Sequence, residues 1–196
     1  MLDTHRDRFL WLELFLAGTF QGLPFTPNQY TSLAVAVALA GSFVLARQYY
    51  AAATSLFFVA FMLDLVDGAV ARAKGLSSKK GAYVDTVADR YIEAFLLLGL
   101  LFVPLPSLFV PSSVWIFLIL LGSMMTTYSK AAAKEKGLSE IELKGGLMSR
   151  AERLIVVFLI LILLVLGYNS WAAYLLALLA ILANITALQR IAMALG

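Results

Sequence analysis

The 196-residue chain contains no cysteine and a single histidine, and charged residues make up only 14% of it. Without cysteine, the protein has no disulfide and no thiol nucleophile. Hydrophobic residues account for 62% of the chain, and the mean hydropathy is +0.89. A soluble globule needs more polar surface than this composition supplies. The shortage of charge therefore predicts an integral membrane protein.

Six apolar stretches come close to the length of about 20 residues that a membrane-spanning helix needs. The alternating apolar and polar pattern of a transmembrane barrel is absent, and no linker or internal repeat divides the chain. We therefore predict an all-α fold of one domain over residues 1–196, with a transmembrane bundle over 28–190. The six expected spans are 28–47, 50–72, 82–103, 112–134, 151–167 and 170–190.

Residues 1–22 mix apolar and charged side chains in a roughly helical rhythm, which predicts an amphipathic helix at the membrane interface. A cleaved signal peptide would have an uninterrupted apolar core after a positive start. Arg6, Asp7, Arg8 and Glu13 interrupt this segment, so we expect no targeting signal.

Lysine and arginine gather on one side of the expected bundle. They precede the first span and occupy the second and fourth connections, whereas the breaks at 104–113 and 167–171 contain none. Since cytoplasmic loops carry an excess of such residues, both termini and the Lys- and Arg-rich side are expected in the cytoplasm, at the cell membrane. The pI near 9.2 fits attraction to anionic lipid headgroups and requires no nucleic acid.

Four aspartates stand at or inside the predicted ends of the second and third spans: Asp64, Asp67, Asp85 and Asp89. An aspartate at mid-bilayer costs about 2.5–3.5 kcal/mol on insertion scales, so such residues persist where they have partners and a role. Spacings of three and four residues place each pair on one helix face. The short connection between the spans brings the two pairs together.

Clustered carboxylates in a low dielectric repel one another, and a divalent cation removes that repulsion. Oxygen ligands favour Mg²⁺, Mn²⁺ or Ca²⁺ over zinc. The small residues Gly68, Ala71 and Gly81 nearby would let a phosphorylated ligand approach the backbone. Arg72 could either bind a diphosphate oxygen or pair with one of the aspartates.

The order Asp64, Asp67-Gly68, Ala71-Arg72, Gly81, Asp85, Asp89 resembles the signature of the CDP-alcohol phosphotransferases at every fixed position. This resemblance implies that the four aspartates bind Mg²⁺ or Mn²⁺ and that Asp89 is also a catalytic base. It further implies a homodimer.

The same resemblance implies a CDP-binding pocket. Pro27-Asn28 and Thr31 are similar to a Pro-Asn-x-x-Thr segment common in these enzymes, although proline is also ordinary at the start of a helix. The residues expected to line the CDP pocket are Asn28, Thr31, Asp67, Gly68, Ala71, Arg72 and Gly81.

A second group of cations surrounds the fourth connection. Lys130 after Tyr128, and the run from Gly146 to Arg153, resemble the acceptor segment of phosphatidylinositol-phosphate synthases, whose acceptor is inositol 1-phosphate. Lys130, Arg150 and Arg153 are accordingly expected to contact the acceptor phosphate. Cytoplasmic positive charge and headgroup contact are the alternative explanation for the same residues.

Several alternatives remain open at this point. Glycerol 3-phosphate or serine could replace inositol 1-phosphate as acceptor, and the donor could be CDP-diacylglycerol, CDP-archaeol or a water-soluble CDP-polyol. Outside this enzyme class, the carboxylates could line an ion transporter or belong to a silent scaffold. A transporter, however, favours charges at mid-membrane in broken helices and often has an internal repeat.

Overall fold

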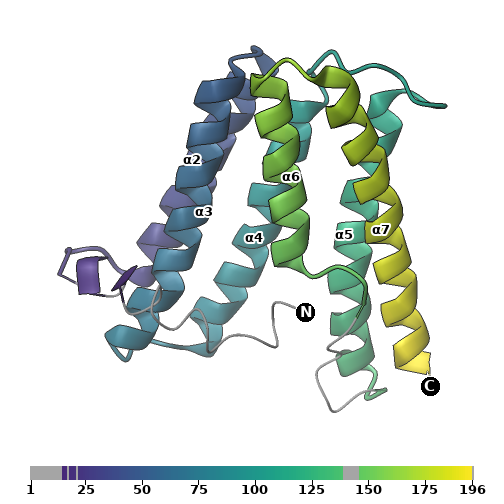
Figure 1. Cartoon of the computed structure of the whole chain (residues 1–196). Helices are drawn as coiled ribbons and strands as arrows, with labels where there is room; N and C mark the ends of the chain where they lie inside the picture. The colour runs from purple at the N-terminus through teal and green to yellow at the C-terminus, as the bar shows by residue number, and fades with distance from the viewer. Residues whose placement is uncertain (1–14, 17, 21, 139–145, 196) are drawn as a thin grey trace. The chain divides into compact units, whose positions relative to one another are not determined.

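The computed structural model describes residues 15–16, 18–20, 22–138 and 146–195. Each of the expected spans overlaps one helix of these described residues (Figure 1). The helices are α2 (Pro27–Ala46), α3 (Tyr50–Ala73), α4 (Lys79–Leu100), α5 (Ser112–Glu135), α6 (Arg150–Val165) and α7 (Asn169–Leu195).

Four of these helices, α2, α3, α5 and α7, are long and apolar enough to cross a membrane. Helix α6 has 16 residues and so measures about 24 Å, less than a hydrocarbon core of about 30 Å. Helix α4 is long enough but carries Asp85, Asp89, Arg90 and Glu93 within its apolar stretch. Length and composition thus support spanning by four helices, and the expectation of six spans stays a prediction.

Hydroxyl side chains fix where three of the helices begin. Thr26 caps α2 and exchanges hydrogen bonds with Gln29, while Pro27 stands at the first helical position. Ser78 accepts a hydrogen bond from the main-chain N–H of Gly81 and thereby caps α4. Ser149 caps α6 in the same reciprocal manner as Thr26.

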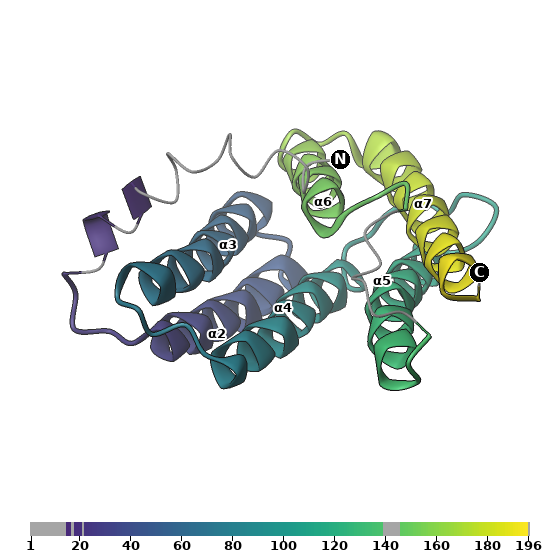
Figure 2. The ribbon, with the colours of Figure 1, turned by 90° about the horizontal axis from the view of Figure 1, so that it is seen from below.

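The described residues fall into two compact units, within Thr4–Val103 and within Pro104–Gly196. In the first unit, α2 packs along both α3 and α4, whereas α3 and α4 touch each other far less (Figure 2). The approach of α2 to α4 is close because Gly99 has no side chain: a Cβ there would lie 3.0 Å from the carbonyl oxygen of Ser42. Whether both units form one domain stays a prediction.

The second unit has a corresponding plan, in which α7 packs against both α5 and α6. At Gly122 of α5 the backbone of α7 comes so close that a Cβ would lie 2.8 Å from the carbonyl carbon of Ala183. Asn184 adds a hydrogen bond from its amide to the carbonyl of Leu118, 2.8 Å away. Small residues with polar contacts are the usual means of joining helices in lipid, where the hydrophobic effect gives no drive.

The amphipathic helix expected over 1–22 lies mostly outside the described residues. Within the described part, Leu16 is buried against Tyr30 of α2 and Val66 and Val70 of α3. Lys74, after α3, donates hydrogen bonds to the carbonyl oxygens of Leu23 and Phe25. These contacts hold Leu16, Leu23 and Phe25, which precede α2, in place.

Gly122→Ala should destabilise the protein, because the added methyl group meets backbone atoms of α7 that cannot turn aside. Overpacking of this kind costs about 1–3 kcal/mol, more than the helix propensity of about 1 kcal/mol that alanine gains over glycine. Thermal unfolding in detergent measures the change. Gly22→Ala is the control, since nothing lies within 4 Å of a Cβ there. Equal melting temperatures for the two variants would contradict the close packing of α5 on α7.

Candidate metal and nucleotide site

Three of the four predicted aspartates lie together in the first unit. Asp64 and Asp67 of α3 and Asp85 of α4 each offer a carboxylate oxygen, and these oxygens lie within 4.8 Å of one another. Asp64 and Asp67 are buried and Asp85 is half-buried. The predicted convergence of the two helices at their charged ends is therefore present.

Thr31 of α2 orients one of these carboxylates. Its buried hydroxyl donates to Oδ2 of Asp67 at 2.5 Å and lies 3.1 Å from the carbonyl oxygen of Pro27. A hydrogen bond to a metal-binding carboxylate fixes the direction of its remaining lone pairs. The first turn of α2 thus sets the orientation of a carboxylate on α3.

The donor set suits a hard divalent cation. Three carboxylates bring up to three negative charges into a buried site, and carboxylate oxygen is the ligand type of Mg²⁺ and Mn²⁺. Oδ1 of Asp64 is buried and accepts no hydrogen bond from the described residues, although Asp64 has other polar interactions. A cation would give this oxygen a partner.

A pocket of about 310 Å³ opens beside the carboxylates. Asp67 and Asp85 form part of its wall, so a ligand in the pocket lies next to the carboxylate cluster. All seven residues expected to bind CDP line it: Asn28, Thr31, Asp67, Gly68, Ala71, Arg72 and Gly81.

Two glycines shape this pocket in different ways. A Cβ on Gly68 would lie 3.3 Å from Nη1 of Arg72, so the absence of a side chain lets the guanidinium lie over the helix. A Cβ on Gly81 would lie 3.2 Å from Oγ of Ser78 and 3.8 Å from Oδ1 of Asn28. Gly81 therefore brings the start of α4 close to the start of α2.

Asp89 lies one turn after Asp85 on α4, half-buried, and is not among the three clustered carboxylates. The expectations that Asp89 binds metal and serves as a base stay predictions.

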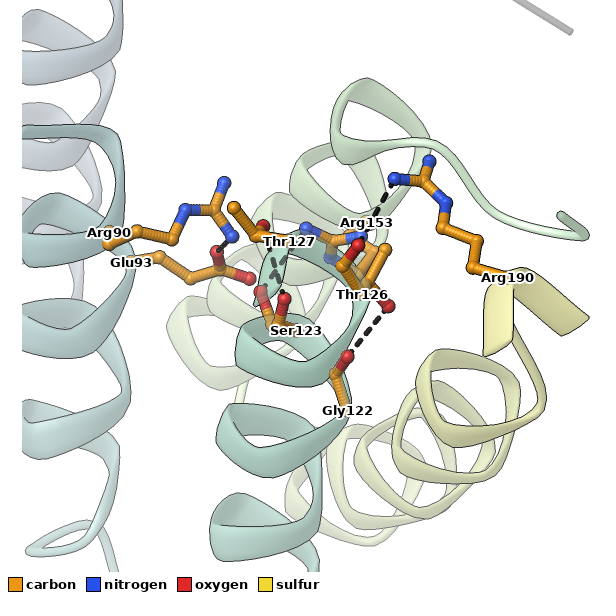
Figure 3. A network of polar contacts seen from close by, with 8 residues as sticks. All are labelled: Arg90, Glu93, Gly122, Ser123, Thr126, Thr127, Arg153 and Arg190. Carbon is orange, nitrogen blue, oxygen red and sulfur yellow. Dashed lines mark hydrogen bonds and ion pairs between the residues drawn. The ribbon is translucent and has the colours of Figure 1, made fainter. Parts of the chain in front are cut away.

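The residues expected to bind the acceptor phosphate lie in the second unit. Lys130 is half-buried near the end of α5, and Arg150 is the first residue of α6. Arg153 is only 3% exposed, and its Nη2 donates to Oγ of Ser123 on α5 at 3.2 Å. Figure 3 shows this contact.

Two further arginines stand out in Figure 3. Arg190 of α7 donates to the carbonyl oxygen of Thr126 at 3.3 Å, and Arg90 of α4 pairs with Glu93 at 2.8 Å. Neither the Arg190 contact nor the Arg90–Glu93 pair was predicted from the sequence. The spacing of three residues on one helix was the available signal for that pair.

The sequence reasoning also missed the residues between α3 and α4 that complete the pocket wall, Leu76, Ser77 and Ser78. The capping role of Ser78 was detectable, because serine three residues before Gly81 at the start of an apolar run is a common helix start. Its position against a ligand pocket depends on how α2 and α4 pack.

Comparison with known proteins identifies the class to which these features belong. The profile of the CDP-alcohol phosphatidyltransferase family matches residues 25–188, which include all the helix starts and carboxylates described above. The chain belongs to the CDP-alcohol phosphatidyltransferase family. It is therefore a membrane transferase of substituted phosphate groups in phospholipid biosynthesis, and the transporter and scaffold alternatives fall away.

Curated relatives are about a third identical to this chain over the aligned residues. An archaetidylinositol phosphate synthase of Pyrococcus horikoshii is 34% identical over 72% of this chain and 71% of its own. A bifunctional IPC transferase and DIPP synthase of Aquifex aeolicus is 38% identical over 82% of this chain but only 37% of its own. A phosphatidylinositol phosphate synthase of Mycobacterium tuberculosis is 32% identical over 67% of this chain and 60% of its own.

Solved structures of the mycobacterial phosphatidylinositol phosphate synthase have a similar fold. One with CDP-DAG bound has a TM-score of 0.78 at 24% identity, over 93% of this chain and 92% of that one. Another, in complex with manganese and citrate, has a TM-score of 0.77 at 26% identity, over 88% and 83%.

Thr31→Val should weaken Mn²⁺ binding about 10- to 100-fold, the usual effect of losing a hydrogen bond to a metal ligand, because Asp67 loses its orienting hydroxyl. Electron paramagnetic resonance of free Mn²⁺ measures the affinity of the purified protein. Thr86→Val is the matched control, since the exposed Thr86 hydroxyl only donates to the carbonyl of Ala82 in its own helix. An unchanged Mn²⁺ affinity in Thr31→Val would show that Asp67 needs no such support.

Proposed function

We propose that this protein transfers a substituted phosphate group from a CDP-linked lipid to the hydroxyl of a phosphorylated alcohol and releases CMP. The observation that carries the proposal is one pocket whose wall contains all seven expected CDP contacts and two of the clustered carboxylates. Its volume of about 310 Å³ is at the lower end of the range for small-molecule sites.

The metal would be Mg²⁺ or Mn²⁺, held by Asp64, Asp67 and Asp85, with Asp89 as the fourth ligand implied by the family signature. When bound, such ions neutralise developing charge on the diphosphate oxygens and favour loss of the acceptor proton. The complex of a related synthase with manganese supports this choice of metal.

The side chains of the pocket would hold the donor. Arg72 supplies a permanent positive charge for a diphosphate oxygen, and Gly68 leaves room for its guanidinium. Asn28 and Gly81, at the starts of α2 and α4, lie where main-chain N–H groups at helix N-termini favour an anion. The donor phosphate is thereby positioned before any bond changes.

The reaction would be a direct displacement at the phosphorus that bears the donor alcohol. The acceptor oxygen forms a bond to this phosphorus. The bond between the phosphorus and the bridging oxygen of the diphosphate breaks, and CMP leaves with the electron pair of that bond. Asp89 would take the acceptor proton. Positioning and electrostatics would supply most of the rate, as in other phosphoryl transfers.

A second hollow favours a lipid donor over a soluble CDP-polyol. It lies between α2 and α4, is mostly apolar, and is lined by Thr31, Ser32, Val35, Tyr83, Val84, Val87, Ala88 and Tyr91. Thr31 belongs to the walls of both hollows, so the apolar groove adjoins the pocket beside the carboxylates at this residue. A lipid chain would occupy this groove, from a CDP-diacylglycerol or a CDP-archaeol. The CDP-DAG complex of a related synthase supports this type of donor.

Inositol 1-phosphate is the acceptor that the proposal favours, since the relatives from Pyrococcus horikoshii and Mycobacterium tuberculosis are named archaetidylinositol phosphate synthase and phosphatidylinositol phosphate synthase. Lys130, Arg150 and Arg153 would bind its phosphate. Glycerol 3-phosphate would use the same cations and is the second candidate; serine has no phosphate for them to bind.

The charge distribution supports an active site facing the cytoplasm at the cell membrane, since the carboxylate pocket lies at the Lys- and Arg-rich ends of α3 and α4. A homodimer and a single domain over 1–196 complete the proposal. Both come from the family resemblance and the lack of an evident linker.

Purified protein with Mg²⁺ or Mn²⁺ and CDP-diacylglycerol or CDP-archaeol should release CMP when inositol 1-phosphate is added, and Asp89→Asn should lower the rate at least 100-fold because the base is lost. Glycerol 3-phosphate and serine are compared under the same conditions. Release of CMP with serine as efficiently as with inositol 1-phosphate would overturn the acceptor assignment. No release with any donor and acceptor pair would overturn the proposed reaction.

Val87→Trp should raise the KM for a long-chain CDP-lipid about tenfold, because the indole fills the groove between α2 and α4. CMP binding should be unchanged. Leu98→Trp is the control, on the same helix and exposed but outside the groove. If both variants keep the KM of the unmodified protein, the donor chain does not lie there.

A further inference from the structure

Side chains of α7 hold the segment that precedes α6, residues 146–149, although the two lie some forty residues apart in the sequence. The main-chain N–H of Leu147 donates to Oε1 of Gln189 at 2.8 Å, and that of Met148 donates to Oγ1 of Thr186 at 3.2 Å. The next N–H, of Ser149, donates to Oε2 of Glu152 at 2.7 Å. Three consecutive main-chain donors are thus satisfied by side chains, two of which come from α7.

The Thr186 hydroxyl has a fixed orientation. Thr186 is completely buried, and its hydroxyl donates to the carbonyl oxygen of Leu182 at 2.8 Å. Because a hydroxyl has a single proton, its lone pairs then face the N–H of Met148. This contact fixes where the segment before α6 lies along α7 and how its backbone is oriented there.

The backbone of the segment is also pressed against α7. Gly146 has a φ of +109°, and a Cβ there would lie 2.7 Å from Cγ2 of Thr186. Only glycine adopts this conformation at such a distance without strain. The methyl group of Thr186 therefore limits how far residues 146–149 can move toward α7, while its hydroxyl holds them there.

This clamp, formed by Thr186 and Gln189, ends directly at the two arginines that the proposed function assigns to the acceptor phosphate. Arg150 is the first residue of α6, and Arg153 reaches Ser123 of α5 from its first turn. Cations at the start of a helix oppose its dipole, so an anion bound beside them is favourable. The Ser149 cap and the clamp fix where the helix that carries them begins.

We infer that Thr186 and Gln189 are positioning residues for the acceptor: they contact no substrate but set where Arg150 and Arg153 meet the acceptor phosphate. The inference rests on the proposed function and deepens it, because it assigns acceptor recognition to uncharged side chains of α7.

Thr186→Val and Gln189→Met keep side-chain volume and remove the accepting oxygens, so each should raise the KM for inositol 1-phosphate about tenfold, and the double variant further. The kcat and the KM for the CDP-lipid should stay within about twofold, because the donor pocket lies in the other unit. Thr186→Ser, which keeps the hydroxyl, should recover most of the acceptor KM. Asn184→Leu is the matched control: it removes a hydrogen bond from α7 to α5 but none to the clamped segment.

Steady-state kinetics and melting temperatures are measured together. A lower melting temperature with unchanged acceptor KM in Thr186→Val and Gln189→Met would show a purely structural role and overturn the inference. The inference would also be overturned if Asn184→Leu raised the acceptor KM as much as Thr186→Val and Gln189→Met do. If Thr186→Val fails to fold, Gln189→Met and Thr186→Ser decide the question. Failure of the unmodified protein to use any phosphorylated acceptor, while still releasing CMP, would overturn the acceptor assignment and this inference but leave the CDP chemistry in place.

Discussion

Electrostatic repulsion among three carboxylates is the constraint that the fold of the unit within Thr4–Val103 has to meet. Three carboxylate oxygens within 4.8 Å of one another, two of them on buried residues, are unfavourable without a compensating charge. Helix α2 supports the arrangement by packing along both α3 and α4 and by placing the Thr31 hydroxyl on Asp67. A divalent cation would supply the missing charge, so that binding of metal and close approach of the two helices depend on each other.

Both units use the same division of roles among their helices. The helix that packs against both neighbours, α2 or α7, carries small residues and uncharged polar side chains, whereas the charged residues stand mostly on the flanking helices, Arg190 of α7 being an exception. Thr31 of α2 orients Asp67, and Thr186 of α7 holds the approach to Arg150. Hydroxyl groups suit this task in lipid because a threonine satisfies a polar neighbour without adding a charge.

Much of the fold was predictable because apolar length and helix-start residues are local properties. The six apolar stretches coincide with α2 to α7, and the spacing of Asp64 and Asp67 against Asp85 predicted their convergence. Which helices cross the membrane was less predictable. Helix α4 carries too many charges, and α6 is too short, to count among the helices that are long and apolar enough to span. Gly68 was expected to leave room for a ligand, and the structure places the Arg72 guanidinium over it.

The sequence alone determined the membrane class, the helix positions, the family signature and seven of the residues that line the pocket beside the carboxylates, because each depends on composition or on short fixed spacings. Only the tertiary structure decided which partners these residues have: Thr31 with Asp67, Arg153 with Ser123, and the segment before α6 with Thr186 and Gln189. Such pairs join helices from distant parts of the chain. Their contacts follow from the rotation and depth at which helices pack, and no local sequence pattern specifies those quantities.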